Sequence, residues 1–422
     1  MKKALPLLLL MLVVAAATAQ AQDYPELIRK TQRYLSVFPE NNAERLALAW
    51  YFMQNAQPDS ALARYQEVAL RDPASADAAS GSLWALNSLN RYPETLHRSA
   101  DLIRAFPKNP DIFNHRGLAL LQTYSPLSAR ASYRSAQKLA APNSFSAAIA
   151  ADGLAWSCLN SGDYASAEGL VRKNPASFSV TPWLEKTRSA FSAGFGYKQN
   201  GNVYFLGKAS LRRKTLSLAM GFEEYRIAGQ HFRTALDLEL GKQFHPLDLE
   251  LSAKLLSGVD AGSYPAWQGS ASATGKVYLA GLRLGPLLSL RYTYAPVFSA
   301  AQADLGFKVL TDRLNLLLMY SALYRDFLSA STDQNGQVFT GIADLRLYRS
   351  MRLSLSSSHG DLAWWTNPYG VTLDTFYPNA TNLGLGLSLP LGSGFGLSLY
   401  GQLGLIDASQ NYLLQSVLSY TP

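Results

Sequence analysis

The sequence predicts a chain of mixed α and β structure in two parts, an N-terminal α-helical solenoid followed by an antiparallel transmembrane β-barrel of about fourteen strands. Two patterns predict this division. From about residue 191 to residue 420, hydrophobic residues alternate with small or charged ones, whereas before residue 176 prolines recur about every 34 positions. Alternation with a period of two is typical of strands that face lipid on one side and water on the other.

The N-terminus has the features of a secretory signal. Lys2 and Lys3 precede an apolar run over residues 4–17, and residues 19–21 form a cleavage site of the small-x-small type. We therefore expect residues 1–21 to be a signal peptide. No later stretch has the ~20 continuous apolar residues that a spanning helix needs. An exported chain with repeated amphipathic strands is expected in the bacterial outer membrane.

Composition narrows the classes of function. The chain has 422 residues, enough for two sizeable domains, and its net charge of +8 is scattered, so we expect no nucleic-acid partner. Cys158 is the only cysteine, which excludes an internal disulfide and a cysteine-based zinc site. Its place between Trp156 and Leu159 predicts a small buried residue.

Residues 22–175 are predicted to form helical repeats. The recurring prolines are Pro39, Pro73, Pro107, Pro142 and Pro175. Between them, large and small residues recur where two antiparallel helices would pack, as in Leu48, Ala49, Phe52, Ala61 and Tyr65, then Phe113, Gly117, Leu120, Ala129, Tyr133 and Ala136, and finally Leu154, Ala155, Gly162, Asp163, Tyr164 and Ala167.

The period and these positions resemble the tetratricopeptide repeat. The copy over residues 76–107 is the poorest, with Ser99 where an aromatic residue is usual. The resemblance implies a curved solenoid whose concave surface binds a periplasmic protein or glycan. A spacer without a dedicated ligand is the alternative.

After a linker over residues 176–188, we expect a barrel over residues 189–422. The predicted strands span residues 189–199, 202–213, 215–227, 231–243, 247–258, 270–284, 286–296, 299–310, 313–327, 337–349, 351–359, 381–391, 395–407 and 411–421. Most exceed the ~9–11 residues that a tilted strand needs to cross the membrane. Twelve or sixteen strands would remain compatible with one misplaced hairpin.

The connections between these strands alternate in length. The short ones lie at residues 213–214, 245–246, 285–286, 311–312, 349–350 and 392–394, and the long ones at residues 259–269, 329–336 and 360–380. Outer-membrane barrels have short periplasmic turns and longer external loops. The asymmetry therefore predicts that both ends of the barrel, and with them the helical repeats, lie in the periplasm.

The alternation also predicts which residues line the lumen. The residues expected to face lipid are Phe232, Leu236, Leu238, Leu240, Leu247, Leu249 and Leu251. The expected lumen-lining residues are Lys208, Arg212, Glu223, Arg233, Asp237, Glu239, Asp248, Glu250, Lys254, Arg283, Arg291, Asp304, Lys308, Asp344, Arg346 and Arg352. An Arg or Lys on the lipid face would cost ~2–4 kcal/mol near the midplane. Mixed charge fits a wet channel and equally a closed interior filled by ion pairs.

Two sets of aromatic residues have expected roles at the membrane surface. Tyrosines suited to interfacial girdles are Tyr292, Tyr294, Tyr320, Tyr324, Tyr348, Tyr400, Tyr412 and Tyr420. The loop over residues 360–380 is a candidate external contact surface and holds Trp364, Trp365, Tyr369, Phe376 and Tyr377. Aromatic faces stack on sugars and on partner side chains. Packing of this loop into the barrel opening is the alternative.

No catalytic constellation is evident, so we expect no enzyme, no cofactor and no metal site. The histidines His97, His115, His231, His245 and His359 are dispersed. The last strand, with Tyr412, Leu414, Leu418 and Tyr420 on alternate positions, resembles the assembly signal of barrel proteins. This implies the outer-membrane assembly machinery as a partner, although the chain ends in Thr421 and Pro422.

A signal peptide, helical repeats and a C-terminal barrel together resemble YaiO-like outer-membrane barrels and, more distantly, exopolysaccharide export porins. That resemblance implies a non-enzymatic outer-membrane channel or exporter, with polysaccharide as the expected cargo. The alternatives are an envelope scaffold, in which the barrel is an anchor and the repeats recruit a periplasmic partner, and a barrel-borne enzyme.

Overall fold

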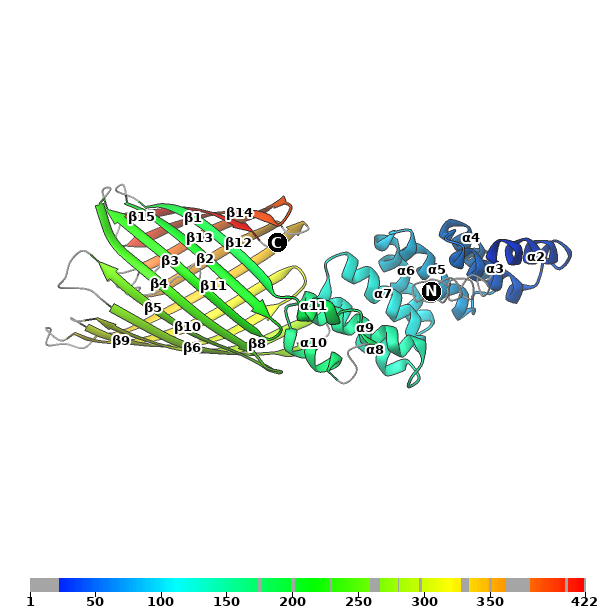
Figure 1. Cartoon of the computed structure of the whole chain (residues 1–422), viewed down its shortest axis with the longest axis horizontal. Coiled ribbons are helices and arrows are strands. Elements are labelled where there is room, and N and C mark those ends of the chain that lie inside the picture. Colours follow the sequence, from blue (N-terminus) through cyan, green and yellow to red (C-terminus); the bar gives the residue numbers. More distant parts are fainter. Residues whose placement is uncertain are drawn as a thin grey trace, which may run out of the picture. The chain divides into compact units, whose positions relative to one another are not determined.

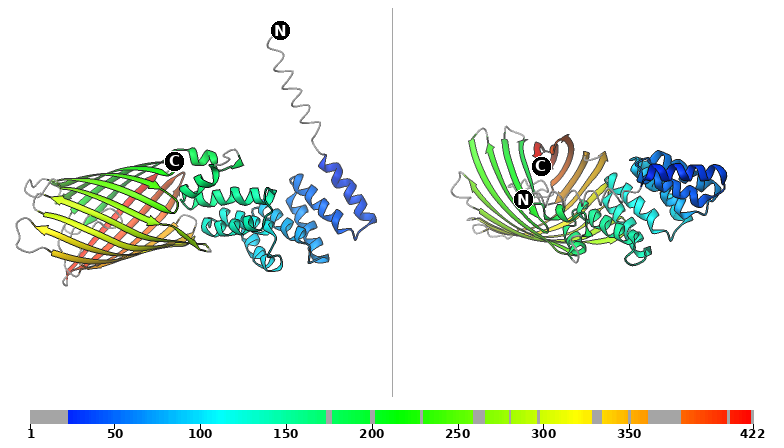
Figure 2. Two further views of the ribbon diagram at one scale, coloured as in Figure 1. Left: turned by 90° about the horizontal axis from the view of Figure 1, so that it is seen from below. Right: turned by 45° about the vertical axis from the view of Figure 1, so that its right-hand side comes forward.

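A computed structural model describes residues 23–172, 177–198, 202–227, 230–258, 266–279, 281–295, 298–327, 334–348, 351–360, 380–406 and 409–420. The predicted signal peptide and the aromatic loop with Trp364, Trp365, Tyr369, Phe376 and Tyr377 lie outside these residues. Helices precede a closed antiparallel barrel, as the sequence predicts (Figures 1 and 2). Within the described residues, no helix is long and apolar enough to cross a membrane.

The helices repeat with a constant offset. They are α2 (Tyr24–Val37), α3 (Asn42–Gln54), α4 (Pro58–Arg71), α5 (Ala76–Ser88), α6 (Tyr92–Ala105), α7 (Pro110–Gln122), α8 (Pro126–Leu139), α9 (Phe145–Asn160), α10 (Tyr164–Val171) and α11 (Thr181–Glu185). The starts of α3, α5 and α7 are 34 residues apart, as are those of α4, α6 and α8. The poorest copy, which contains Ser99, therefore folds like its neighbours.

Local sequence signals set these boundaries. The side chains of Asn41, Ser75 and Asn109 accept hydrogen bonds from the first turns of α3, α5 and α7. Such N-caps satisfy backbone N–H groups that have no partner within the helix. Each turn between paired helices contains one residue of positive φ, at Ala56, Asn90, Tyr124 and Gly162.

The contacts divide the chain into two compact units. Of the described residues, those up to residue 123 together with residues 135–147 form the first, and residues 124–134 together with those from residue 148 onward form the second. The core of the first unit includes Leu48, Leu83 and Ile112. In the second, Ala155, Cys158 and Leu159 of α9 pack with Ala167 and Val171 of α10 and with Leu184 of α11. Helix α11 lies within residues 176–188, the stretch expected to be a linker.

The strands are β1 (Arg188–Lys198), β2 (Asn202–Arg213), β3 (Leu216–Ile227), β4 (Gln230–Gln243), β5 (Leu247–Gly258), β6 (Ala266–Gly275), β7 (Val277–Leu279), β8 (Leu282–Ala295), β9 (Phe298–Leu310), β10 (Leu314–Phe327), β11 (Gln334–Tyr348), β12 (Met351–Gly360), β13 (Ala380–Gly392), β14 (Phe395–Ile406) and β15 (Ser409–Tyr420). Strand β1 pairs with β15, and β6 and β7 both pair with β8. Because β6 and β7 are two segments of one strand position, the barrel has fourteen strands.

The prediction was wrong for the hairpin around Gly285 and Pro286. These residues lie inside β8, and the chain turns instead near Gly281, whose φ is +90°. Pro286 lacks an N–H, so it interrupts the ladder with the neighbouring strand, which breaks at Lys276 between β6 and β7. Proline therefore marks a break in the partner strand and not the end of its own.

The assignment of Tyr400 to an interfacial girdle was also wrong. Tyr400 alternates with the exposed Leu399 and is only 8% exposed. Its hydroxyl lies 3.2 Å from the hydroxyl of Ser356. Gly384 and Gly386 on β13 leave room for the ring, since a Cβ at Gly384 would lie 2.2 Å from the Tyr400 hydroxyl.

Candidate functional site: the inner wall of the barrel and its short-turn end

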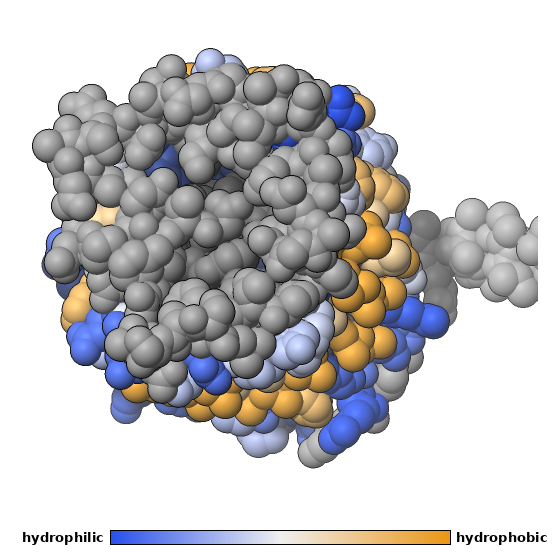
Figure 3. Space-filling model, turned by 90° about the vertical axis from the view of Figure 1, so that its left-hand side faces the viewer, coloured by the Kyte–Doolittle hydropathy of each residue, from blue (hydrophilic) through white to orange (hydrophobic). Residues whose placement is uncertain are grey.

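The two faces of the barrel wall differ in chemistry. On β4, Leu236, Leu238 and Leu240 are 53%, 48% and 43% exposed, and they alternate with Asp237 and Glu239. Hydrophobic surface is visible along the barrel flank in Figure 3. Because successive residues of a strand point to opposite faces, the charged residues occupy the inner wall.

Ion pairs connect charged residues on this inner wall. The Nζ of Lys208 on β2 lies 2.6 Å from a carboxylate oxygen of Glu239 on β4. The Nζ of Lys254 on β5 lies 2.9 Å from Glu223 on β3 and 3.9 Å from Asp237 on β4. The pairs with Glu239 and Glu223 each bridge one intervening strand. They run along the wall, since residues two strands apart are ~10 Å apart in the sheet.

Other described residues predicted to line the lumen take no part in the ion pairs of Lys208 and Lys254. Asp304 accepts a hydrogen bond from Gln302, and Asp344 accepts one from Asn315. Asp248 pairs with Lys276 at 2.5 Å. The remaining predicted residues with described side chains lie on β2, β5, β8, β9, β11 and β12: Arg212, Glu250, Arg283, Arg291, Lys308, Arg346 and Arg352. The side chain of Arg233 on β4 lies outside the described residues.

One end of the barrel, here called the short-turn end, carries the tight connections and both barrel termini. Its turns include those between β2 and β3, between β4 and β5, between β9 and β10, and between β13 and β14. Lys214 and Ser393 adopt positive φ in two of these turns. In the second compact unit, residues of α8 and α10 contact this end directly.

The turn between α9 and α10, residues 161–164, meets inner-wall residues at the short-turn end. Arg283 of β8 donates to the Ser161 carbonyl, at 3.4 Å. Gln243 of β4 donates to the Gly162 carbonyl, at 3.1 Å, and accepts from the N–H of Tyr164, at 3.0 Å. These contacts join residues about 80 or more positions apart in the sequence.

Tyr164 extends these contacts to the first two strands. Its hydroxyl accepts a hydrogen bond from Arg188 of β1, at 3.0 Å. The guanidinium of Arg212 on β2 lies 4.9 Å from the centre of its ring. A cation above an aromatic face is attracted by the ring's negative π surface.

Asp163 is the most connected residue of the turn and is fully buried. Its carboxylate accepts from Arg130 of α8 at 2.8 Å, from the Tyr278 hydroxyl of β7 at 2.5 Å and from Lys276 at 3.3 Å. It also caps α10 through the N–H of Ser166. The side chain of Lys276 is 1% exposed, and its Nζ lies between two carboxylates, 3.3 Å from that of Asp163 and 2.5 Å from that of Asp248.

These contacts determine the protonation state of Asp163. Burial alone would raise the pKa of its carboxyl, but hydrogen bonds from Arg130, Ser166 and Tyr278, together with the charge of Lys276, outweigh burial. The pKa of Asp163 is therefore lowered well below its usual range. By contrast, burial raises the pKa of the nearby Cys158 thiol to about 12, so this cysteine is a neutral packing residue.

A second contact holds α8 at the same end of the barrel. Asp312, in the turn between β9 and β10, accepts from the N–H groups of Leu127 and Ser128, at 2.8 and 3.0 Å. It also accepts from the Ser128 hydroxyl, at 2.6 Å. A carboxylate is favoured there because the first N–H groups of a helix are unpaired and carry partial positive charge.

Sequence reasoning missed the residues that bind the turn. Asp163 was assigned only to a turn between helices, and Gln243, Lys276 and Tyr278 were not selected. A signal was present in Lys276, a lone charge between the small residues of β6 and the hydrophobic residues of β7. The partners of these residues are distant in sequence, so their pattern alone does not reveal the contact.

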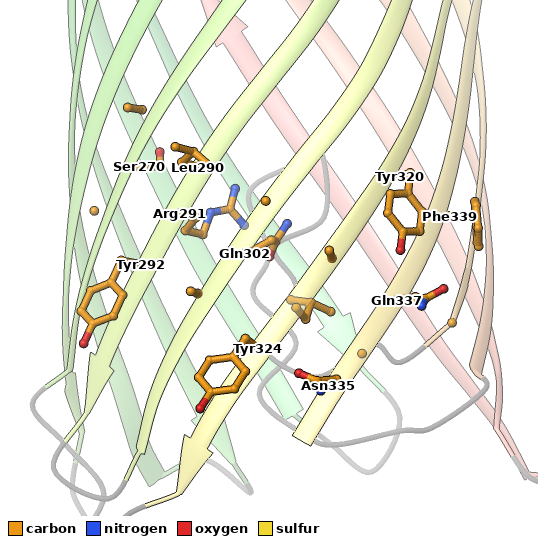
Figure 4. Close-up of a pocket in the computed structure, with 18 of the residues that line it drawn as sticks. Ser270, Leu290, Arg291, Tyr292, Gln302, Tyr320, Tyr324, Asn335, Gln337 and Phe339 are labelled. Atoms are coloured by element: carbon orange, nitrogen blue, oxygen red, sulfur yellow. The ribbon is translucent and has the colours of Figure 1, made fainter. Parts of the chain in front are cut away.

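A groove of about 1060 Å³ is lined by residues of β6 and of β8 to β12 (Figure 4). Tyr292, Tyr324 and Phe339, which lie on its sides, are among the exposed aromatic residues of the barrel. Arg291 and Gln302 contribute to the same lining. Arg291 and Tyr292 are consecutive residues of β8, so they point to opposite faces of the barrel wall.

The described residues contain no group of three or more histidine, cysteine, aspartate or glutamate side chains that could hold a metal ion. Two of the histidines have hydrogen-bond partners. The Nδ1 atom of His245 lies 3.1 Å from the Ser166 hydroxyl, and that of His359 lies 2.8 Å from the Thr381 hydroxyl.

Comparisons with known proteins find similar folds only. No protein-family model and no curated protein matches the chain. Among solved structures, a tetratricopeptide-repeat protein of Thermus thermophilus is 19% identical, with a TM-score of 0.31, covering 39% of this chain and 90% of that one. A bacterial polysaccharide outer-membrane secretin is 12% identical, with a TM-score of 0.37, covering 56% and 98%. The CymD monoaromatic hydrocarbon channel is 13% identical, with a TM-score of 0.35, covering 60% and 92%.

Proposed function

We propose that this protein is a non-enzymatic channel or exporter of the bacterial outer membrane, whose helical repeats lie in the periplasm and bind a partner. The observation that carries the proposal is the closed fourteen-stranded barrel with a hydrophobic outer face and a charged inner wall. A barrel of this kind satisfies every backbone hydrogen bond within the membrane. Its lumen offers polar surface to a hydrophilic cargo.

The width of the barrel supports a channel over a purely structural anchor. Eight strands enclose an interior that side chains can fill, and the diameter grows with strand number. Fourteen strands enclose more space than that. The ion pairs of Lys208 with Glu239 and of Lys254 with Glu223 follow the wall, so these charges compensate one another locally without bridging the lumen.

The orientation follows from the short-turn end. Outer-membrane barrels place their short turns in the periplasm. With this orientation, β1 begins on the periplasmic side, and the helices that precede it in the chain lie there as well. Export through the signal peptide and insertion by the outer-membrane assembly machinery complete the proposed route.

Polysaccharide is the proposed cargo, and a recurring position of the repeats supports it. Trp50, Trp84 and Leu118 are 34 residues apart on α3, α5 and α7, the first helices of successive repeats. Trp50 also contacts Tyr24 and Tyr51, with ring centres 5.9 and 5.7 Å away. Two of these three positions are aromatic, and aromatic faces one repeat apart can stack on sugar rings.

An envelope scaffold is the second candidate, and one observation favours it. The turn at residues 161–164 is held at the short-turn end by Arg188, Gln243, Lys276 and Arg283. If these contacts were permanent, the barrel would act as an anchor for the repeats. The partner of the repeats would then be a periplasmic protein.

The test is the conductance of the purified protein in a planar bilayer. A channel is expected to give discrete current steps, and an oligosaccharide cargo is expected to shorten or block them. A protein that inserts but gives no current steps, even after substitution of the residues that hold the turn at residues 161–164, would favour the scaffold.

The corresponding measurement for the repeats is binding of oligosaccharides to the wild type and to Trp50→Ala and Trp84→Ala variants.

A further inference from the structure

The turn between α9 and α10 contacts one continuous arc of the barrel. Its partners lie on β1, β2, β4, the junction of β6 with β7, and β8. These strands span seven adjacent positions of the fourteen. All of the partner side chains belong to the inner wall, so the turn reaches the entrance of the lumen and not the outside of the barrel.

We propose that residues 161–164 form a plug that closes the short-turn end of the lumen and leaves it when the contacts of Asp163 break. This inference rests on the proposed channel function. It adds a gate that belongs to the helical repeats, because the plug is the turn of the last helix pair. The plug couples the position of these helices to passage through the barrel.

The geometry of the turn matches that of the earlier repeats, but its chemistry does not. Gly162 has the positive φ found at the equivalent residues Ala56, Asn90 and Tyr124. The next residue caps the following helix with its side chain only in some copies. Gln57 makes no such hydrogen bond, whereas Asp163 caps α10 and also binds three side chains.

The two sides of the plug differ in a way that allows movement. Toward the helices, Ala167 and Val171 of α10 are part of an apolar cluster with Ala155 and Leu159 of α9. Toward the barrel, the plug makes hydrogen bonds, an ion pair and a contact between a cation and an aromatic ring. Polar groups can exchange such partners for water, whereas separating an apolar core exposes hydrocarbon. The helices are therefore expected to move together when the plug leaves.

The ion pair between Lys276 and Asp163 is one contact that breaks when the plug leaves the barrel. Lys276 is held between Asp163 of the plug and Asp248 of β5. When the plug leaves, Lys276 retains one carboxylate partner on the barrel wall. Arg130 of α8 keeps its contact with Asp163 when the helices move, and this movement also breaks the contact of α8 with Asp312 and that of the Arg130 guanidinium with the Tyr278 ring, whose centre is 3.5 Å away. Both sides thus keep part of their charge compensation, which lowers the barrier to separation relative to an unshared buried pair.

The test compares single-channel currents of full-length wild type, Asp163→Ala and Asp152→Ala. Asp152 is the matched control because it is a carboxylate of α9 whose hydrogen bonds go to Ser179 and not to the barrel. Asp163→Ala is expected to raise the open fraction by roughly tenfold or more, since removing one partner of a buried ion pair shifts an equilibrium by at least that factor. Asp152→Ala is expected to match the wild type.

A cross-link makes the test independent of whether Asp163→Ala folds. Ser166 and His245 have side-chain atoms 3.1 Å apart, so a Ser166→Cys, His245→Cys protein in a Cys158→Ser background can join α10 to the turn between β4 and β5. The oxidised protein is expected to stay closed, and reduction is expected to restore openings. Adding Asp163→Ala should raise the open fraction only after reduction.

Two outcomes would overturn the proposal in different ways. Equal currents from wild type and Asp163→Ala, together with equal currents from the oxidised and reduced cross-link protein, would show that the turn does not gate the lumen while the channel itself stands. Inserted barrels that never conduct in any of these states would reject the channel and the plug together.

Discussion

At the scale of single residues, Asp163 shows how one carboxylate can hold two parts of a fold together. It is buried, yet it carries a charge because Arg130, Lys276 and Tyr278 supply compensating hydrogen bonds and charge. Removing one partner from a buried ion pair costs about 3–5 kcal/mol, since the other charge is left without compensation. Asp163 is therefore the residue at which small changes should have the largest effect.

The lowered pKa of Asp163 predicts how the contact depends on pH. For a carboxyl whose pKa is lower in the folded state, the stabilisation is present above the ordinary pKa of ~3.9 and is lost as pH falls below it. The ionisable groups that face Asp163 and its partners are Arg130, Arg134, Cys158, His245, Asp248, Lys276, Tyr278 and Arg283. We expect the open fraction to stay constant from pH ~7 to about 5 and to rise below about 4.

Asp163→Asn is the control for this pH dependence. Asparagine has no carboxyl to titrate, so the variant should show a raised open fraction already at neutral pH and little further change on acidification. The measurement is the open fraction in planar bilayers at graded pH. A rise with acid that is just as large in Asp163→Asn would assign the effect to other carboxyl groups.

Gly81 and Tyr65 give a second test at this scale. A Cβ at Gly81 would lie 2.3 Å from a ring carbon of Tyr65, and Gly153 has the same relation to Tyr133. Gly81→Ala is therefore expected to destabilise the helical repeats by about 1–3 kcal/mol through overpacking. Loss of the helical circular dichroism signal on heating measures this. Gly169→Ala should be neutral or stabilising, because the new methyl group would have no atom within 4 Å beyond its chain neighbours and the backbone of its own helix.

At the scale of elements, each strand carries two chemistries on alternating positions. On β4 and β5, exposed leucines alternate with charged residues such as Glu239 and Lys254, which form ion pairs with residues two strands away. A shift of one residue in register would place every charge in lipid. The alternation therefore fixes both the face of each strand and its register against the next.

Leu238→Arg is expected to impair barrel assembly. Its side chain is exposed on the hydrophobic face, where an arginine costs ~2–4 kcal/mol near the membrane midplane. The matched control is Ser252→Arg, which places the same residue on the inner wall opposite Glu239. The assembled fraction, measured by the shift in gel mobility on boiling, should fall for the first variant only. Equal assembly of both would contradict the assignment of faces.

At the scale of the whole molecule, the closed barrel determines where the protein can be stable. Its outer face exposes apolar side chains that water would not tolerate over such an area, among them Leu236, Leu251, Leu290, Leu305, Leu318, Phe339, Leu385 and Leu414. Closure by the pairing of β1 with β15 leaves no free strand edge among the described strands. Both features are suited to a bilayer.

The protein should therefore fractionate with the outer membrane and migrate faster on a gel before boiling than after. The physical reason is that a closed barrel resists unfolding by detergent in the cold. Immunodetection of membrane fractions and of unboiled samples checks both statements. Recovery with the inner membrane or in the soluble fraction would contradict the proposed location.

The sequence alone determined the local features of this protein. The 34-residue period predicted the repeated helices, and the period of two predicted a barrel of fourteen strands, because both patterns report which side of an element is buried. Only the tertiary structure decided the rest. Pro286 was expected in a tight turn between two strands, but pairing with β9 keeps it inside β8, and the break lies instead at Lys276. Asp163 and Lys276 are 113 positions apart, and such a contact follows from how the elements pack, which no local pattern encodes.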